Sequence, residues 1–231
     1  DVIDIICRHP ATARFIARHL YNFFVADEPQ VPAWERVPPR DPEAIEMLAH
    51  AFIESNYDIR SVLRVLFNSN FFKEATFARV KSPVEMVVGT ARAAGGFQFP
   101  DVADIQLALQ PAYMGQQVLD PPSVEGWHTG LEWVNTASLV NRVNFAVGQF
   151  SDPANPGVNE MINTISSVND NLPPDQLVAA CLDILGPLEV SDRTRHELVQ
   201  QAVDGDKFLT VDERIRTMLQ MIVSTREYQL A

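Results

Sequence analysis

Helix start signals recur along this chain and constrain its fold more than any other feature of the sequence. Proline stands at an expected first helical position in His9-Pro10, Asp41-Pro42 and Ser82-Pro83. Glutamate follows a serine or threonine three positions later in two capping boxes, Ser82 to Glu85 and Thr210 to Glu213. No segment alternates polar and apolar residues for long enough to predict a β-strand. We therefore expect an all-α, multi-helix bundle.

Apolar residues recur at helical spacing after most of these starts. The first such stripe, which we expect to face the core, comprises Phe15, Ile16, Leu20, Phe23 and Phe24. Further helices are expected after Asp58 and Ser69, after Asp101 or Asp104 with a break or kink near Pro111, from about Ala137, and over residues 158–168, 174–185, 191–204 and 211–227. Glycines predict helix ends at Gly95-Gly96, Gly186 and Gly205.

Two stretches between these helices are predicted to be irregular. Residues 27–40 contain four prolines, and residues 114–133 form a long loop that holds prolines and tryptophans but shows no clear period. Past Phe150 the composition shifts to a link rich in proline, asparagine and glycine. We therefore expect a main helical body over 1–150 and a C-terminal helical subdomain over 151–231, packed on that body.

The charge of the chain is negative and unevenly placed. The formal net charge is -12, and residues 93–231 hold 7 basic against 18 acidic side chains. Such a surface repels polyanions, so we expect no nucleic-acid partner. No apolar run approaches the roughly 18 residues that predict a transmembrane segment. The histidines and cysteines lack metal-ligand spacing, and no glycine-rich phosphate loop occurs, so we expect no metal and no cofactor.

The first candidate site lies at the start of the helix that begins at Pro10. Arg14 and Arg18 stand one turn apart on one face, where a pair of guanidinium groups binds a carboxylate or phosphate. His9 lies beside the positive end of this helix, which also favours an anion. The alternative, which we favour, is that the two arginines pair with internal acids and tie helices together.

The second candidate site is the loop at 114–133. Its tryptophans, Trp127 and Trp133, suggest the walls of a pocket, and Asp120, Glu125 and His128 are its candidate polar groups. The favoured alternative is a proline-rich loop that the tryptophans pin to the helices.

The order and spacing of several motifs resemble one family. These motifs are HPATARFIARHLYNFFVADEP (9–29), KSPVEMVVGTARA (81–93), MGQ with PPSVEGW (114–127), Trp133, RVNFA (142–146) and the terminal MLQMIVSTREYQLA. They resemble the bacterial DUF1800 family, whose members are usually about twice this long, so the resemblance implies the C-terminal half of such a protein. The start Asp1-Val-Ile-Asp-Ile-Ile, which reads as the tail of a helix, fits that expectation.

This resemblance implies a helical, often exported protein that is periplasmic, extracellular or on the cell surface. It also implies a DUF1501-like protein, often encoded beside it, as a candidate partner, and export raises the odds of a bridge between Cys7 and Cys181. The family implies no reaction. Our leading hypothesis is a non-catalytic interaction or scaffold module of an exported bacterial assembly. The alternative is a hydrolase-like enzyme whose site is shared with a missing N-terminal half.

Overall fold

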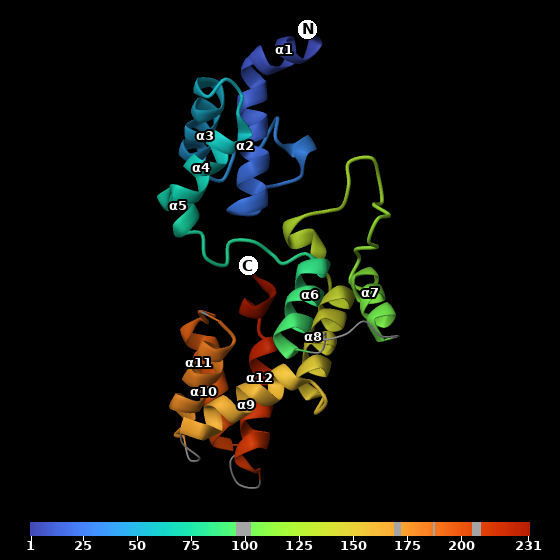
Figure 1. Cartoon of the computed structure of the whole chain (residues 1–231), viewed down its shortest axis with the longest axis vertical. Coiled ribbons are helices and arrows are strands. Elements are labelled where there is room, and N and C mark those ends of the chain that lie inside the picture. Colours follow the sequence, from blue (N-terminus) through green and yellow to red (C-terminus); the bar gives the residue numbers. More distant parts are fainter. Residues whose placement is uncertain (96–102, 169–171, 187, 205–208) are drawn as a thin grey trace. The chain divides into compact units, whose positions relative to one another are not determined.

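The computed structural model describes residues 1–95, 103–168, 172–186, 188–204 and 209–231. Helices make up most of these residues and no β-strand occurs among them, which confirms the all-α, multi-helix prediction (Figure 1). The predicted signals at Gly96, Asp101 and Gly205 lie outside the described residues.

Contacts between Cα atoms divide the chain into two compact units. Unit 1 comprises Asp1–Val80, His128–Leu131 and Ala231, and unit 2 comprises Lys81–Trp127 and Glu132–Leu230. Each unit has a hydrophobic core of its own. This division differs from the boundary expected at residue 150, because the helix that ends at Ser151 shares one core with the helices that follow it.

Unit 1 is built from short helices, and those that follow His9, Asp41, Asp58 and Ser69 begin where the sequence predicts, whereas η1 lies in the stretch predicted to be irregular. They are α1 (Val2–Arg8), α2 (Pro10–Phe24), η1 (Val31–Ala33), α3 (Pro42–Glu54), α4 (Ile59–Asn68) and α5 (Asn70–Lys73). The caps explain these starts, since the Asp41 carboxylate accepts from Ala44 N at 3.0 Å and the Asp58 carboxylate accepts from Ser61 N at 3.0 Å. Ser69 caps α5 in the same way, with Oγ accepting from Phe72 N.

The core of unit 1 corrects the stripe expected on α2. Its buried residues on this helix include the small side chains Ala13 and Ala17, which let α2 and α3 approach closely. Phe15 and Phe23 are instead 46% and 64% exposed. The Phe15 ring packs edge-on against His19 and Trp34 rather than entering the core. Ile16, Leu20 and Phe24 of the predicted stripe do pack against this core, so the apolar spacing identified part of the buried face.

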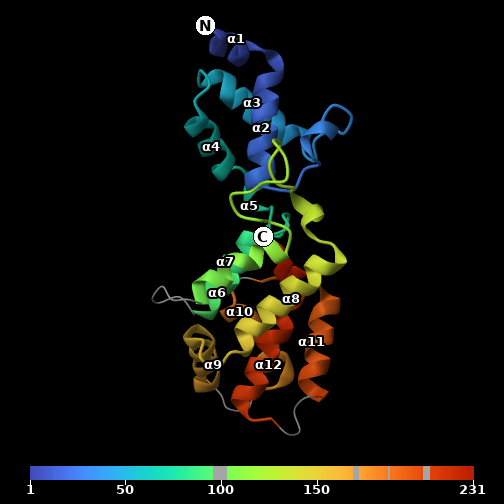
Figure 2. The same ribbon diagram turned by 90° about the vertical axis from the view of Figure 1, so that its right-hand side faces the viewer.

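The short η2 (Gly130–Trp133), at the end of the loop predicted to be irregular, has its first two residues in unit 1 and its last two in unit 2. Unit 2 contains the other helices of the described residues (Figures 1 and 2). They are α6 (Pro83–Ala94), α7 (Ala103–Tyr113), α8 (Thr136–Ser151), α9 (Pro156–Val168), α10 (Pro174–Ile184), α11 (Asp192–Asp204), α12 (Val211–Val223) and η4 (Glu227–Gln229). Both predicted capping boxes are present, at the starts of α6 and α12. Pro111 lies inside the last turn of α7, and the helix continues to Tyr113. Helix α12 ends at Val223, four residues before the expected end.

The core of unit 2 forms where α8 and α12 pack side by side, as Figure 2 shows. Phe150 of α8 and Leu219 and Ile222 of α12 are fully buried there. Helix α9 crosses α6 at Gly157, where an added Cβ would lie 2.6 Å from the carbonyl oxygen of Ala93. Glycine is therefore required at this crossing, because the two backbones occupy the space of a side chain.

The two cysteines are both free thiols. Cys181 is enclosed in the core of unit 2, and burial raises the pKa of its thiol to about 12. A thiol so protonated is a poor nucleophile at neutral pH.

Candidate functional site

The residues of the first candidate site are engaged in contacts within unit 1. His9 is the N-cap of α2, with Nδ1 accepting from Ala11 N at 3.2 Å. Arg14 forms a bidentate ion pair with Glu46 of α3. This hydrogen bond raises the pKa of Arg14 and lowers the pKa of Glu46. The Arg14 guanidinium therefore joins α2 to α3, which corresponds to the favoured alternative of pairing with an acid of the same protein.

Arg18 forms the more extensive set of contacts. It is buried and donates from Nε and Nη2 to the Glu28 carboxylate, at 2.8 and 2.6 Å. It also donates to the carbonyl oxygens of Val37 and Pro38, and its guanidinium lies 4.6 Å from the Trp34 ring centroid. These contacts hold the proline-rich loop at 27–40 against α2. They correspond to the alternative in which Arg14 and Arg18 pair with internal acids.

The loop of the second candidate site is anchored at both ends within unit 2. Met114 and Trp133 are buried. The Gln116 side chain accepts from Val84 N at 3.0 Å, and the Trp133 carbonyl accepts from Ser138 Oγ at 2.8 Å. Contacts with the start of α6 and with the start of α8 therefore hold the two ends of this loop in place.

The polar residues of this loop are distributed between the two units. Asp120 and Glu125 belong to unit 2 and are exposed, and the Asp120 carboxylate accepts from Gln117 Nε2 at 3.0 Å. Trp127 is half-buried, and it too belongs to unit 2. His128 is exposed and belongs to unit 1. Next to it in unit 1, Thr129 Oγ1 accepts from Gln30 Nε2.

The middle of the loop presents apolar side chains to solvent. Every residue from 117 to 125 is exposed. Val118 is 48% exposed, Leu119 is 90% exposed and Val124 is fully exposed. We call residues 117–125 the loop tip. In Figure 1 it runs as coil between α7 and α8.

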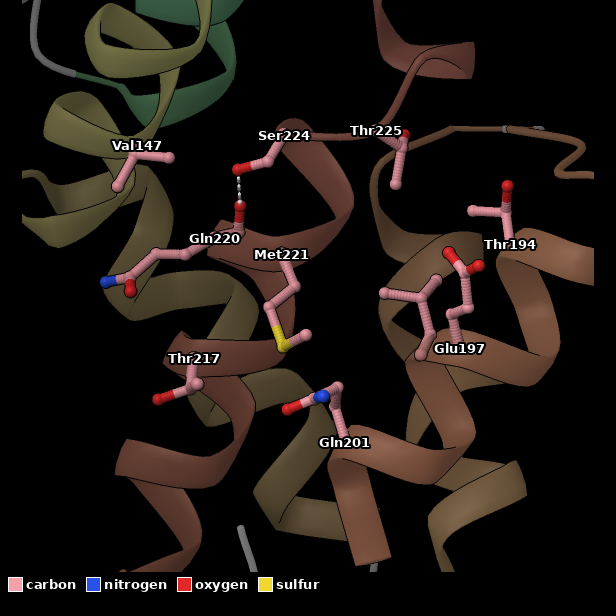
Figure 3. Close-up of a pocket in the computed structure, with 10 residues that line it drawn as sticks. Val147, Thr194, Glu197, Gln201, Thr217, Gln220, Met221, Ser224 and Thr225 are labelled. Atoms are coloured by element: carbon pink, nitrogen blue, oxygen red, sulfur yellow. Dashed lines mark hydrogen bonds between the residues drawn. The ribbon is translucent and has the colours of Figure 1, made fainter. Parts of the chain in front are cut away.

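A groove on unit 2 is a further candidate that the sequence did not indicate. It has a volume of about 570 Å³ and lies between α11 and α12, with Val147 of α8 at one side (Figure 3). Apolar side chains, among them Leu198 and Met221, provide part of its surface. Its polar lining is Thr194, Glu197, Gln201, Thr217, Gln220, Ser224 and Thr225. These residues recur at helical spacing, a pattern that by itself predicts an ordinary solvated helix face.

Three of the four hydroxyl groups that line this groove donate hydrogen bonds within the protein. Ser224 Oγ donates to the Gln220 carbonyl at 2.7 Å, as the dashed line in Figure 3 shows. Thr225 Oγ1 donates to the Ile222 carbonyl, and Thr194 Oγ1 donates to Glu227. The described residues that line it include neither histidine nor cysteine.

The fold and these surfaces define an all-α protein of two helical units that carries an anchored, exposed loop. The chain belongs to the DUF1800 family, described as a protein of unknown function, whose family model matches residues 1–230. No curated protein and no solved structure matches the chain. Among the described residues, no helix has the length and apolar character needed to cross a membrane, and no three potential metal ligands cluster.

Proposed function

We propose that this chain is a non-catalytic interaction module and that the loop tip is the segment that contacts its protein partner. The observation that carries this proposal is the exposure of Val118, Leu119 and Val124 on a loop whose two ends are buried. Burying apolar surface contributes roughly 25 cal/mol per Å². A partner that covers these aliphatic groups therefore gains binding energy at a defined place.

The backbone conformation of the loop tip supports a role in binding a partner. Leu119 has a φ of +68°, a left-handed backbone conformation that residues other than glycine rarely adopt. Pro121 and Pro122 follow after Asp120 and restrict the chain further. A segment held in one conformation loses less entropy when it binds, which favours association.

The charge of the loop tip indicates the chemistry of the partner. Asp120 and Glu125 flank the exposed aliphatic residues, and no lysine or arginine occurs from Ala93 to Asn141. A complementary surface is an apolar groove bordered by lysine or arginine. The family resemblance supports an exported bacterial assembly, with a DUF1501-like protein as the partner to test first.

A binding measurement tests this proposal. Replacing Leu119 and Val124 together with serine should weaken binding to the DUF1501-like protein at least about tenfold in isothermal titration calorimetry, because a single well-buried aliphatic side chain contributes about 1.5–3 kcal/mol. The matched control is Ile105→Ser with Val140→Ser, which removes exposed aliphatic groups from α7 and α8.

Equal affinity of the loop variant and the control would exclude the loop tip as the contact. Hydrolysis of an ester or phosphate substrate by the unmodified chain, abolished in His128→Ala, would favour the hydrolase-like alternative instead.

A further inference from the structure

Unit 2 encloses a guanidinium group whose hydrogen-bond acceptors, among the described residues, are both neutral. Arg142 of α8 is 0% exposed. Its Nε donates to the side-chain oxygen of Gln229 at 2.8 Å, and its Nη2 donates to the carbonyl oxygen of Lys81 at 2.7 Å. Buried arginines are ordinarily paired with a carboxylate, because taking an unpaired charge out of water is costly.

A second cation lies in the same place. Lys81 Nζ donates to the Tyr228 carbonyl at 2.8 Å and lies 4.5 Å from the centroid of the Tyr228 ring. Burial, with repulsion from Arg142, lowers the pKa of Lys81 to about 8. Burial also lowers the pKa of Arg142 to about 10. The charge of Glu85 opposes both shifts, but its Oε2 already accepts from Ser82 N in the capping box.

Two donor groups in this cluster lack an acceptor. Arg142 Nη1 and Gln229 Nε2 are buried and have no hydrogen-bond partner in the described part of the chain. They belong to two side chains that are already bonded to each other. Each group carries only N–H donors, so the requirement of this site is for an acceptor. Buried donors are satisfied in native proteins in the great majority of cases.

We propose that a compact monovalent anion of the chloride class binds beside Arg142, where it accepts a hydrogen bond from Arg142 Nη1. The Glu85 carboxylate acts on both Arg142 and Lys81, so one negative charge faces two cations, and the anion supplies a second. Its small size follows from the burial of Arg142. Its role is structural, because Arg142 links α8 to Lys81 and to Gln229 near the end of the chain.

Anion-specific stabilisation tests the site independently of the loop tip. Urea unfolding of the whole chain is followed by circular dichroism while chloride replaces gluconate at constant sodium concentration. A ligand that binds only the folded state raises the folding constant by the factor 1 + [L]/Kd, which is about elevenfold at ten times Kd. We expect a saturable rise with chloride and with bromide. A linear or anion-independent change would overturn the proposal.

A charge-matched pair of variants locates the effect. Gln229→Glu places a carboxylate on Arg142 Nε, so the chloride response should disappear. Gln200→Glu adds the same charge at an exposed position of α11 and should keep the response. An undiminished response in Gln229→Glu contradicts the assignment. If that variant does not fold, bromide-soaked crystals of the unmodified protein decide the matter. An anomalous peak within hydrogen-bonding distance of Arg142 Nη1 supports the site, and a water molecule there without bromide refutes it.

Discussion

At the scale of single residues, buried charges separate structural side chains from exposed ones. Arg18 and Arg14 occupy successive turns of α2, yet Arg18 is buried against Glu28 while Arg14 is exposed against Glu46. Removing one partner of a buried pair leaves an uncompensated charge, whereas an exposed pair contributes little. The two arginines, equivalent in the sequence pattern, therefore have different effects on stability.

Arg18→Met should lower the free energy of unfolding of unit 1 by about 3–5 kcal/mol, because the Glu28 carboxylate remains buried without its partner. Urea unfolding measures this loss. Arg14→Met is the matched control and should change the unfolding midpoint little. Similar losses in the two variants would contradict the distinction between the buried and the exposed pair.

Lys81 predicts a pH dependence of stability with a defined sign. Its pKa is about 8 in the folded protein and 10.5 ordinarily, so between these values the unfolded chain binds more protons. Stability therefore rises with pH through this window. The destabilisation caused by burying the charged Lys81 ammonium group is fully present below pH 8.

Lys81→Met should abolish this rise, which amounts to on the order of 2 kcal/mol between about pH 8 and 9.5. The measurement is the difference in unfolding free energy between the unmodified chain and the variant at each pH. This difference cancels the opposite contribution of Cys181, whose raised pKa lowers stability above its ordinary value. Lys73→Met, at an exposed position, should leave the slope unchanged. A slope that persists in Lys81→Met would contradict the assignment.

At the scale of helices, the positions of starts follow local rules and the positions of crossings do not. The caps at Asp41, Ser82 and Thr210 act on amides three residues away, so a short window of sequence contains all the interacting groups. The crossing of α6 and α9 depends on Gly157 meeting the backbone of Ala93, which is distant in the sequence. Gly157 follows Pro156 in the segment after Phe150 that the sequence predicts to be a linker, and no residue of that segment indicates this contact.

Gly157→Ala should destabilise unit 2 by about 1–3 kcal/mol, because the added methyl group must displace backbone atoms of α6. Gly148→Ala in α8 is the control. A methyl group added at Gly148 would meet no atom of another helix within 4 Å, and alanine favours a helix interior, so we expect a gain of roughly 0.5–1 kcal/mol. Thermal unfolding of the two variants should give opposite shifts, and shifts of the same sign would contradict the close crossing.

At the scale of the whole molecule, the two cores predict two regions of independent local stability. Leu66 lies in the core of unit 1, and Leu219 lies in the core of unit 2. The two sets of buried residues have no member in common. Segments with separate cores open in separate cooperative steps.

Leu66→Ala should cost about 2–5 kcal/mol and accelerate amide hydrogen exchange in α2–α4. Leu219→Ala, the matched substitution in the other core, should accelerate exchange in α8–α12. Mass spectrometry resolves the two segments. Faster exchange throughout the chain in either variant would show that the cores unfold together.

The amino-acid sequence alone is enough to predict the helical class, most helix starts, the acidic charge and the resemblance to the DUF1800 family. These features depend on composition or on residues within a few positions of each other. Even the loop at 114–133 was recognisable, because it lacks a helical period.

The packing of the helices, in contrast, is needed to know which of these residues are buried and what they contact. Phe23 belongs to an apolar stripe but is exposed, and Arg142 occurs in an ordinary helix but is fully enclosed. The groove between α11 and α12 likewise exists only after the two helices pack. Contacts between segments that are distant in the sequence determine which side chains are buried and which residues they contact. The spacing of residues within one helix does not reveal these contacts.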